Sequence, residues 1–253
     1  MHEAQFHEFN CFITLTYNDE SLPAGGTLVK KHFQDFMKRL RYHVKEKYGI
    51  SRVSYFHCGE YGERLRRPHY HAILFGMDFS DKKEWKRSET GTLYRSEELD
   101  SLWQLGFCSV GAVTLQSCAY VARYVMKKIT GAKASEHYIS VDSDTGEISD
   151  LQPEYITMSL KPAIGERWFA KYQGDVYPDD FAVMDGKKLR VPRYYDKKLE
   201  LVDEDLYKDM KRERVARAST RKARLENGPI RLAVREECKE AALSTLKREF
   251  EDD

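Results

Sequence analysis

The residues around position 70 place two histidines on one face of a strand. Pro68, His69, Tyr70 and His71 run directly into an apolar stretch at 72–75 that ends at a glycine. Such a run is typical of a short buried strand. Because successive side chains of a strand point to opposite faces, His69 and His71 point the same way, about 7 Å apart. Two imidazoles in this arrangement can bind one metal ion if a third ligand approaches from a neighbouring element, or they can be two hydrogen-bonded polar residues.

The preceding segment offers that third ligand. Residues 53–60 are predicted to form a strand that turns through 61–68 into the histidine strand, which makes the two an antiparallel pair. Glu60 is our choice, because it lies near the end of its strand and can reach across the pair. His57 and Glu63 are alternatives, since the register of the pair cannot be fixed from sequence.

A structural role for Glu60 is equally open, because its carboxylate could form a surface ion pair with Arg64 or Arg66. Two nitrogens and one carboxylate would leave positions open for water or substrate, as a catalytic metal requires. Imidazole ligands favour Mn²⁺ or Zn²⁺ by affinity, whereas phosphate chemistry commonly uses Mg²⁺. We therefore expect His69, His71 and Glu60 to hold a divalent cation, Mg²⁺ or Mn²⁺.

A second group of reactive side chains lies on a predicted helix at 118–129. Tyr120 and Tyr124 are four residues apart and so share one face of that helix, and Lys127 continues the same face. Tyrosine is a known covalent nucleophile. A nearby lysine, Lys127 or else Lys128, can neutralise charge that develops on a phosphate. The alternative is a helix that packs two tyrosines onto a sheet.

The remaining pattern indicates the fold class. Strands are expected at 11–17, 106–115 and 154–160, helices at 29–48 and 162–172, and a hairpin around Asp185 and Gly186. Residues 80–100 are polar and read as an excursion that ends in a helix. Strands and helices mixed in this irregular order, with a hairpin that carries the histidines, predict an α+β fold with a mainly antiparallel central sheet flanked by helices. From about residue 198 the chain reads as a charged helical tail.

Charge and cysteine content limit the classes of protein to consider. Charged residues make up 33% of the 253 residues, yet the formal net charge is only +1, so any binding of nucleic acid must come from local clusters. Arg64, Arg66 and Arg67 form one such cluster directly before the histidines. Five cysteines without a Cys-x-x-Cys pair, and no apolar run long enough to cross a membrane, predict a soluble protein of a reducing cytoplasm.

Taken together, these motifs resemble the HUH endonucleases, in which a His-hydrophobic-His strand holds a divalent metal and a tyrosine on a helix attacks DNA. The match is closer still to the rolling-circle replication initiators of microviruses, which are small single-stranded DNA phages, and within these to the gokushovirus branch. The residues that carry this resemblance lie at 12–17, 68–76, 120–128, 155–162 and 191–197.

The resemblance implies an HUH, RRM-like domain at 1–197 and a charged helical extension at 198–253. It implies a site-specific nickase that starts and ends rolling-circle replication in the cytoplasm of a bacterial host. Tyr120 or Tyr124 would attack the scissile phosphate and leave a 5′-phosphotyrosine link. The implied partners are a single-stranded DNA origin and a host helicase and polymerase, with no membrane and an open oligomeric state. Unpaired DNA would lie over the sheet, with the contacting arginines expected to be Arg64, Arg66, Arg67 and Arg123.

Two other functions fit the same residues. A non-catalytic DNA-binding regulator on this sheet would need neither metal nor tyrosine. A metal-dependent hydrolase that uses an activated water would leave no DNA end linked to the protein.

Overall fold

The computed structural model describes residues 1–62, 65–88, 91–123, 128–141, 145–177, 179–184 and 186–245. The chain divides into two compact units, one at Met1–Gly165 and another that begins at Glu166. The functional domain boundary predicted at residue 197 stays a prediction. Within the described residues, no helix combines the length and the apolarity needed to cross a membrane.

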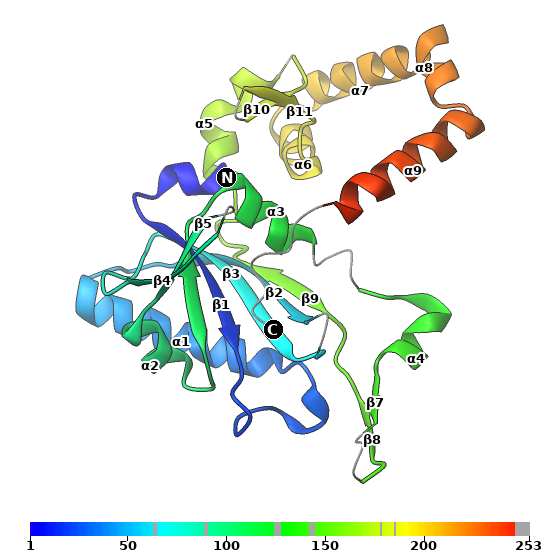
Figure 1. Cartoon of the computed structure of the whole chain (residues 1–253). Helices are drawn as coiled ribbons and strands as arrows, with labels where there is room; N and C mark the ends of the chain where they lie inside the picture. The colour runs from blue at the N-terminus through cyan, green and yellow to red at the C-terminus, as the bar shows by residue number, and fades with distance from the viewer. Residues whose placement is uncertain are drawn as a thin grey trace. The chain divides into compact units, whose positions relative to one another are not determined.

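The first unit is built on a seven-stranded sheet in which neighbouring strands pair antiparallel (Figure 1). In spatial order the strands are β4 (Lys83–Ser88), β5 (Gly91–Arg95), β6 (Cys108–Gly111), β1 (Asn10–Thr16), β3 (Pro68–Phe75), β2 (Ser54–Tyr61) and β9 (Tyr155–Met158). The histidine strand β3 therefore lies inside the sheet, between β1 and β2. This confirms the predicted α+β class, its antiparallel sheet and the pairing of β2 with β3.

One face of the sheet is covered by α1 (Lys30–Tyr48) and α2 (Glu97–Trp103), as Figure 1 shows. The apolar positions of α1 recur at helical spacing, so one stripe of the helix is buried. That stripe, with Phe36 and Leu40 at its centre, packs against Tyr70 and Leu74 of β3. Alternate residues of the histidine strand thus form the main core and leave the histidines on the opposite face.

The opposite face is covered by α3 (Leu115–Arg123). Its residues Tyr120 and Val121 pack against Phe12 of β1 and Ile73 of β3. The helix begins three residues earlier than expected, because Thr114 and Ser117 exchange hydrogen bonds between their side chains and backbone amides at its start. Residues 124–127 lie outside the described residues, and residues 128–130 are not helical, so the predicted helix is observed to Arg123.

Two polar segments contain strands that the sequence did not predict. The excursion at 80–100 holds the β4–β5 hairpin, and the hydrophilic region near residue 145 holds β7 (Ile139–Val141) and β8 (Ile148–Asp150). Short helices complete the first unit: η1 (Glu3–Phe6), η2 (Ala24–Gly26), η4 (Gly131–Lys133) and α4 (Ala134–His137).

The second unit is helical apart from one hairpin, as the sequence predicted. It comprises α5 (Glu166–Val176), β10 (Ala182–Met184), β11 (Lys187–Leu189), α6 (Arg193–Val202), α7 (Glu204–Ala218), α8 (Arg221–Glu226) and α9 (Pro229–Ser244). Phe169, Tyr195, Leu199 and Met210 lie in its small core. Arg214 of α7 binds Asp180 and Asp196, and α9 buries none of its residues.

Candidate site of paired histidines, a carboxylate and a tyrosine

The strand register places the predicted ligands on one face of the sheet. Glu60 of β2 lies directly opposite His69 of β3, and Cys58 lies opposite His71. On the other side of β3, Thr14 of β1 also lies opposite His71. Directly opposed residues of an antiparallel pair point to the same face, so all of these side chains share the face that α3 covers.

His71 and Glu60 form a buried hydrogen-bonded pair at the centre of this face. Nε2 of His71 lies 2.8 Å from Oε1 of Glu60, and each side chain is only 1% exposed. The other ring nitrogen, Nδ1, lies 3.0 Å from the hydroxyl oxygen of Thr14. Phe12 stacks nearly parallel to the imidazole, with ring centroids 5.8 Å apart. These contacts fix the orientation of the His71 ring.

His69 is oriented by the backbone. Its Nδ1 lies 2.7 Å from the carbonyl oxygen of Arg67, and because a carbonyl oxygen only accepts hydrogen bonds, Nδ1 carries the proton. In the neutral ring the lone pair is therefore on Nε2, the nitrogen that a metal would take. The two imidazole rings are parallel within 4°, with centroids 6.5 Å apart.

The donors suit a divalent cation in kind, and one pair is already at suitable spacing. Two ligands at right angles on an ion with bonds of about 2.1 Å lie about 3 Å apart, close to the separation of His71 and Glu60. Both histidines also have a partner on Nδ1, as metal-binding histidines usually do. Among the described residues, however, no set of three or more His, Cys, Asp or Glu side chains is already arranged to hold a metal ion.

Tyr120 approaches the same imidazole from above. Its ring meets that of His71 edge to face, with centroids 5.1 Å apart and planes at 84°, and it makes a similar contact with Phe12 at 6.2 Å. The tyrosine helix and the histidines therefore lie on the same side of the sheet, as a shared site requires. Tyr120 is 1% exposed, so α3 closes this part of the face.

The other predicted site residues are less fully placed. Tyr124, Lys127, Arg64 and the alternative ligand Glu63 lie outside the described residues. Lys128 is exposed, and the guanidinium of Arg123 lies 5.7 Å from the centre of the Tyr120 ring.

The alternative ligand His57 lies on the opposite face of the sheet. It stacks on Phe33 of α1, with ring centroids 3.4 Å apart, and its Nδ1 lies 2.9 Å from the hydroxyl oxygen of Thr157. Burial, and then the charge of His71, lowers the pKa of His57 well below its ordinary value of 6.5. Strand alternation therefore separates His57 from the pair at His71.

A solvent-filled cavity of about 540 Å³ borders the site at His69. Its lining residues are Thr16, Tyr17, Asn18, Asp19, Glu20, Arg67, His69 and Phe107. Arg67 binds the carboxylate of Asp19 at 2.7 Å, and Asp19 is 92% exposed. Such an exposed pair contributes little to stability, so a phosphate can replace the carboxylate at low cost.

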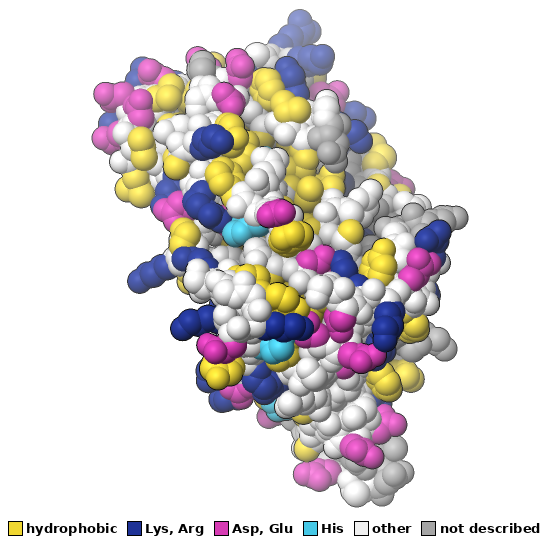
Figure 2. Space-filling model, turned by 90° about the vertical axis from the view of Figure 1, so that its left-hand side faces the viewer, with side chains coloured by type: hydrophobic (Ala, Val, Ile, Leu, Met, Phe, Trp, Pro, Cys, Tyr) yellow, Lys and Arg dark blue, Asp and Glu magenta, His cyan; other side chains and the backbone are white. Residues whose placement is uncertain are grey.

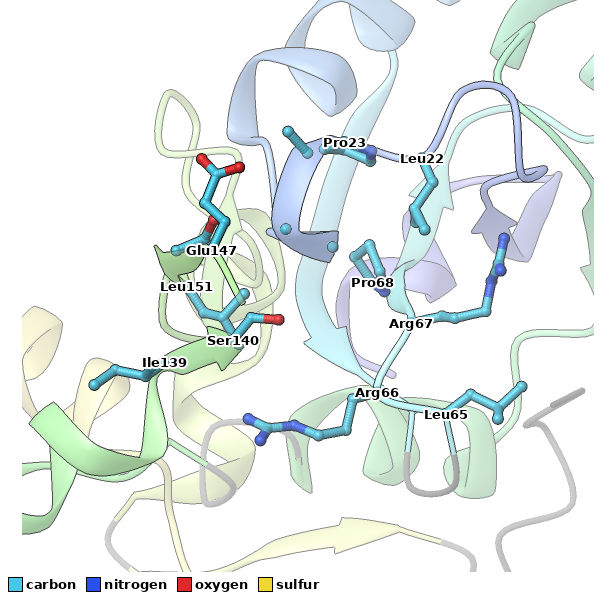
Figure 3. A pocket seen from close by; sticks show the side chains of 14 residues that line it. Leu22, Pro23, Leu65, Arg66, Arg67, Pro68, Ile139, Ser140, Glu147 and Leu151 are labelled. Carbon is cyan, nitrogen blue, oxygen red and sulfur yellow. The ribbon is translucent and has the colours of Figure 1, made fainter. Parts of the chain in front are cut away.

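Arg66 belongs to a different cavity, of about 500 Å³, between η2, the turn before β3 and the β7–β8 hairpin. Figure 3 shows Arg66 pointing toward β7 while Arg67 points away from it. A guanidinium nitrogen of Arg66 donates to the carbonyl of His137 at 3.0 Å. On the face of the molecule shown in Figure 2, basic side chains lie interspersed with acidic ones. Nucleic-acid binding would thus depend on individual residues such as Arg67 rather than on a broad basic surface.

Sequence reasoning missed Thr14. The available signal was that Thr14 and Thr16 occupy alternate positions of an otherwise apolar strand, where hydroxyls on one face require polar partners.

Comparison with known proteins places this geometry in a family. Residues 10–129, which include the histidine strand and α3, match the model of the replication-associated protein ORF2 family. No solved structure matches the chain.

Three phage proteins are similar over most of the chain. Replication-associated protein VP4 of Bdellovibrio phage phiMH2K is 35% identical over 201 residues, covering 77% of this chain and 59% of that protein. Replication-associated protein ORF2 of Spiroplasma virus 4 is 32% identical over 82% of this chain and 64% of its own length. For replication-associated protein ORF4 of Chlamydia phage 1 the values are 31%, 80% and 49%.

The chain thus spans between about half and two thirds of the length of these relatives. The matches confirm the resemblance to phage replication initiators that the motifs indicated. Through residues 10–129, this chain belongs to the family of the replication-associated protein ORF2.

Proposed function

We propose that this protein nicks and rejoins single-stranded DNA to start and end rolling-circle replication of a small circular phage genome. The observation that carries the proposal is the convergence on one imidazole: Glu60 bonds to His71 at 2.8 Å while the ring of Tyr120 lies against the same imidazole. A carboxylate, two histidines and a tyrosine on one sheet face are the groups that metal-assisted phosphoryl transfer to a tyrosine needs.

Each group then has a role. A divalent cation, held by His69, His71 and Glu60, would offset negative charge on the scissile phosphate. The phenol oxygen of Tyr120 or Tyr124 attacks phosphorus and loses its proton to solvent. The bond from phosphorus to the 3′-oxygen breaks, and that oxygen takes up a proton and leaves as a hydroxyl. The 5′ end stays on the tyrosine as a phosphodiester. Lys127 or Lys128 offsets charge in the transition state.

Two tyrosines one helical turn apart allow the reaction to alternate. The first cuts the origin and keeps the 5′ end while the free 3′ end is extended. After one circuit the second tyrosine cuts the regenerated origin, and the waiting 3′-hydroxyl attacks the first phosphotyrosine and restores the circle. On this view the partners are the origin strand and the host helicase and polymerase, in the host cytoplasm.

The burial of Tyr120, His71 and Glu60 adds one requirement. A phosphate can reach them only if α3 moves away from the sheet, because each side chain is 1% exposed. The contacts that hold α3 here are apolar and aromatic, so DNA that enters at the cavity beside His69 would displace packing rather than ion pairs. We therefore include opening of α3 in the proposed cycle.

The test is formation of a covalent complex. The protein is incubated with an end-labelled single-stranded oligonucleotide from the phage origin and Mn²⁺, and the products are separated on a denaturing gel. We expect a labelled band at the mass of the protein plus DNA. Cleaved DNA without that band would support the water-using hydrolase instead, and binding without cleavage would support the regulator.

A further inference from the structure

Beside the histidine site, the same face of the sheet carries a cluster of two exposed aromatic rings and an arginine. Trp85 of β4 is 48% exposed and Phe107, just before β6, is 59% exposed. The guanidinium carbon of Arg95 on β5 lies 5.9 Å from the centre of the Trp85 ring and 5.6 Å from that of Phe107. Two large aromatic side chains held in water around a cation are an unusual surface that points to a ligand.

The cluster borders a cavity of about 310 Å³, lined by Thr14, Thr16, Trp85, Arg95, Phe107, Cys108 and Ser109. That volume is at the lower end of the range for small-ligand pockets, about 300 to 1,000 Å³, and suits a single planar group. Aromatic rings border the cavity and hydroxyl-bearing side chains contribute polar groups. A nucleobase has both matching features, a π-face and a hydrogen-bonding edge.

This cavity is continuous with the candidate site. Thr16 and Phe107 line both it and the cavity that contains His69 and Arg67. Thr14, also in the lining, bonds to His71. From β3 to β5 the sheet crosses three strand spacings, about 14 Å, so the aromatic cluster lies beside the histidines rather than at them.

Charge on the hairpin fits an anionic chain. Lys83, Lys86 and Arg87 on β4 are exposed, against Glu84 as the acidic residue of that strand. Arg95 donates to Asp100 at 2.8 Å, which offsets part of its charge and fixes its position between the rings. Arg95 therefore serves mainly to hold the two rings apart, while the lysines favour a phosphate backbone.

We propose that Trp85, Phe107 and Arg95 form a subsite that binds one unpaired base of the DNA strand next to the scissile phosphate. The inference rests on the proposed function only in taking unpaired DNA as the substrate. The β4–β5 hairpin then acts as the wall that selects single strands, because a paired base cannot leave its stack to enter the cavity without energetic cost.

The test measures equilibrium binding of the full chain to a fluorescein-labelled oligothymidylate, by anisotropy, without a divalent cation. We expect Trp85→Ala and Phe107→Ala each to weaken binding by about tenfold, and Trp85→Phe to retain most of it. Tyr42→Ala is the matched control, since Tyr42 is an aromatic residue of α1, 71% exposed; it should leave the affinity unchanged. Thermal melts check that each variant is folded.

Two comparisons decide the outcome. An oligonucleotide of abasic sites should bind wild-type protein and Trp85→Ala equally, and a duplex should show no dependence on Trp85. Equal affinities of wild type, Trp85→Ala and Phe107→Ala for the oligothymidylate would overturn the inference, as would equal losses on duplex DNA. If no covalent complex ever forms but binding still depends on Trp85, the proposed function fails and the subsite stands. If the complex forms while binding ignores both rings, the reverse holds.

Discussion

The edge of the Tyr120 ring lies against the face of the His71 imidazole, with centroids 5.1 Å apart. This contact joins the helix that carries one predicted nucleophile to the strand that carries the predicted metal ligands. Because His71 is also held by Glu60 and Thr14, a movement of α3 changes the surroundings of a ring whose own position is fixed. The nucleophile and the ligands can therefore be tested separately, by substitutions on the helix and on the strand.

The two tyrosines should be partly interchangeable. Tyr120→Phe keeps the buried ring, so we expect the free energy of unfolding to change by about 1 kcal/mol or less. Tyr120→Phe and Tyr124→Phe should each still form some covalent complex in a first cleavage, whereas the double variant should form none. Denaturing gels with labelled origin DNA measure this. A complex that persists in the double variant would exclude both residues as nucleophiles.

Metal binding should weaken in steps from ligand to supporting residue. His71→Ala removes a proposed ligand and should weaken Mn²⁺ binding by at least about 100-fold, while Thr14→Val removes only a supporting hydroxyl and should cost about tenfold. Calorimetric titration with Mn²⁺ in the absence of DNA gives both values. His57→Phe is the control, because His57 lies on the other face of the sheet. Equal Mn²⁺ affinity in His71→Ala and wild type would contradict the proposed site.

Stability should fall in mild acid because of His57. Its pKa is lowered in the folded protein by burial, so below about pH 6.5 the unfolded chain takes up a proton that the folded chain resists. This destabilisation is absent above that pH, and it grows as the pH falls from about 6.5 toward the folded pKa, by at most about 1.4 kcal/mol per pH unit. Urea denaturation at pH 7.5 and 5.5 should show a smaller loss for His57→Phe than for wild type. An unchanged pH dependence in that variant would refute this role of His57.

Tyr138 should stabilise the segment that follows α3. Its hydroxyl donates to the buried carboxylate of Glu154 and accepts from the backbone amide of Ile129 at 3.0 Å. Burial, and then the bond to Glu154, raises the pKa of Tyr138 to about 12, so it remains a donor at neutral pH. Tyr138→Phe leaves Glu154 without that donor and should cost about 1–3 kcal/mol, measured by urea denaturation.

The exposed Tyr42 supplies the comparison for Tyr138. Tyr42→Phe should change stability by less than about 0.5 kcal/mol. If Tyr138→Phe is equally neutral, the bond to Glu154 contributes nothing. Because Ile129 follows the segment with Tyr124 and Lys127, we also expect slower covalent-complex formation in Tyr138→Phe at full folding.

The sequence predicted those parts of the fold whose pattern is local. The apolar run after His71 and the helical spacing of α1 identify buried elements directly, and the short connection between β2 and β3 implies their pairing. Glu60 was selected correctly as the carboxylate nearest the histidines, because β2 stays regular and side-chain parity then excludes His57 from that face.

The parts that were missed depend on contacts distant in sequence. The β4 strand reads Lys-Glu-Trp-Lys-Arg-Ser, which has no apolar alternation, and it is a strand because β5 pairs with it at the sheet edge. The closure of the site was equally hidden: nothing in the spacing of Tyr120 and Tyr124 indicates that α3 buries the first of them against His71. Packing between separate elements decides such features.

The hydroxyl of Thr14 lies between the imidazole and the neighbouring cavity, and its direction is set by His71. While Nε2 donates to Glu60, the neutral ring accepts at Nδ1, and the hydroxyl hydrogen points at the ring. A cation on Nε2 would shift the ring proton to Nδ1 and make the Thr14 oxygen an acceptor, which turns its hydrogen toward the aromatic cavity. Loading the ion would then change the polarity of a wall that faces the DNA base, so one rotating hydrogen would report the state of one compartment to the next.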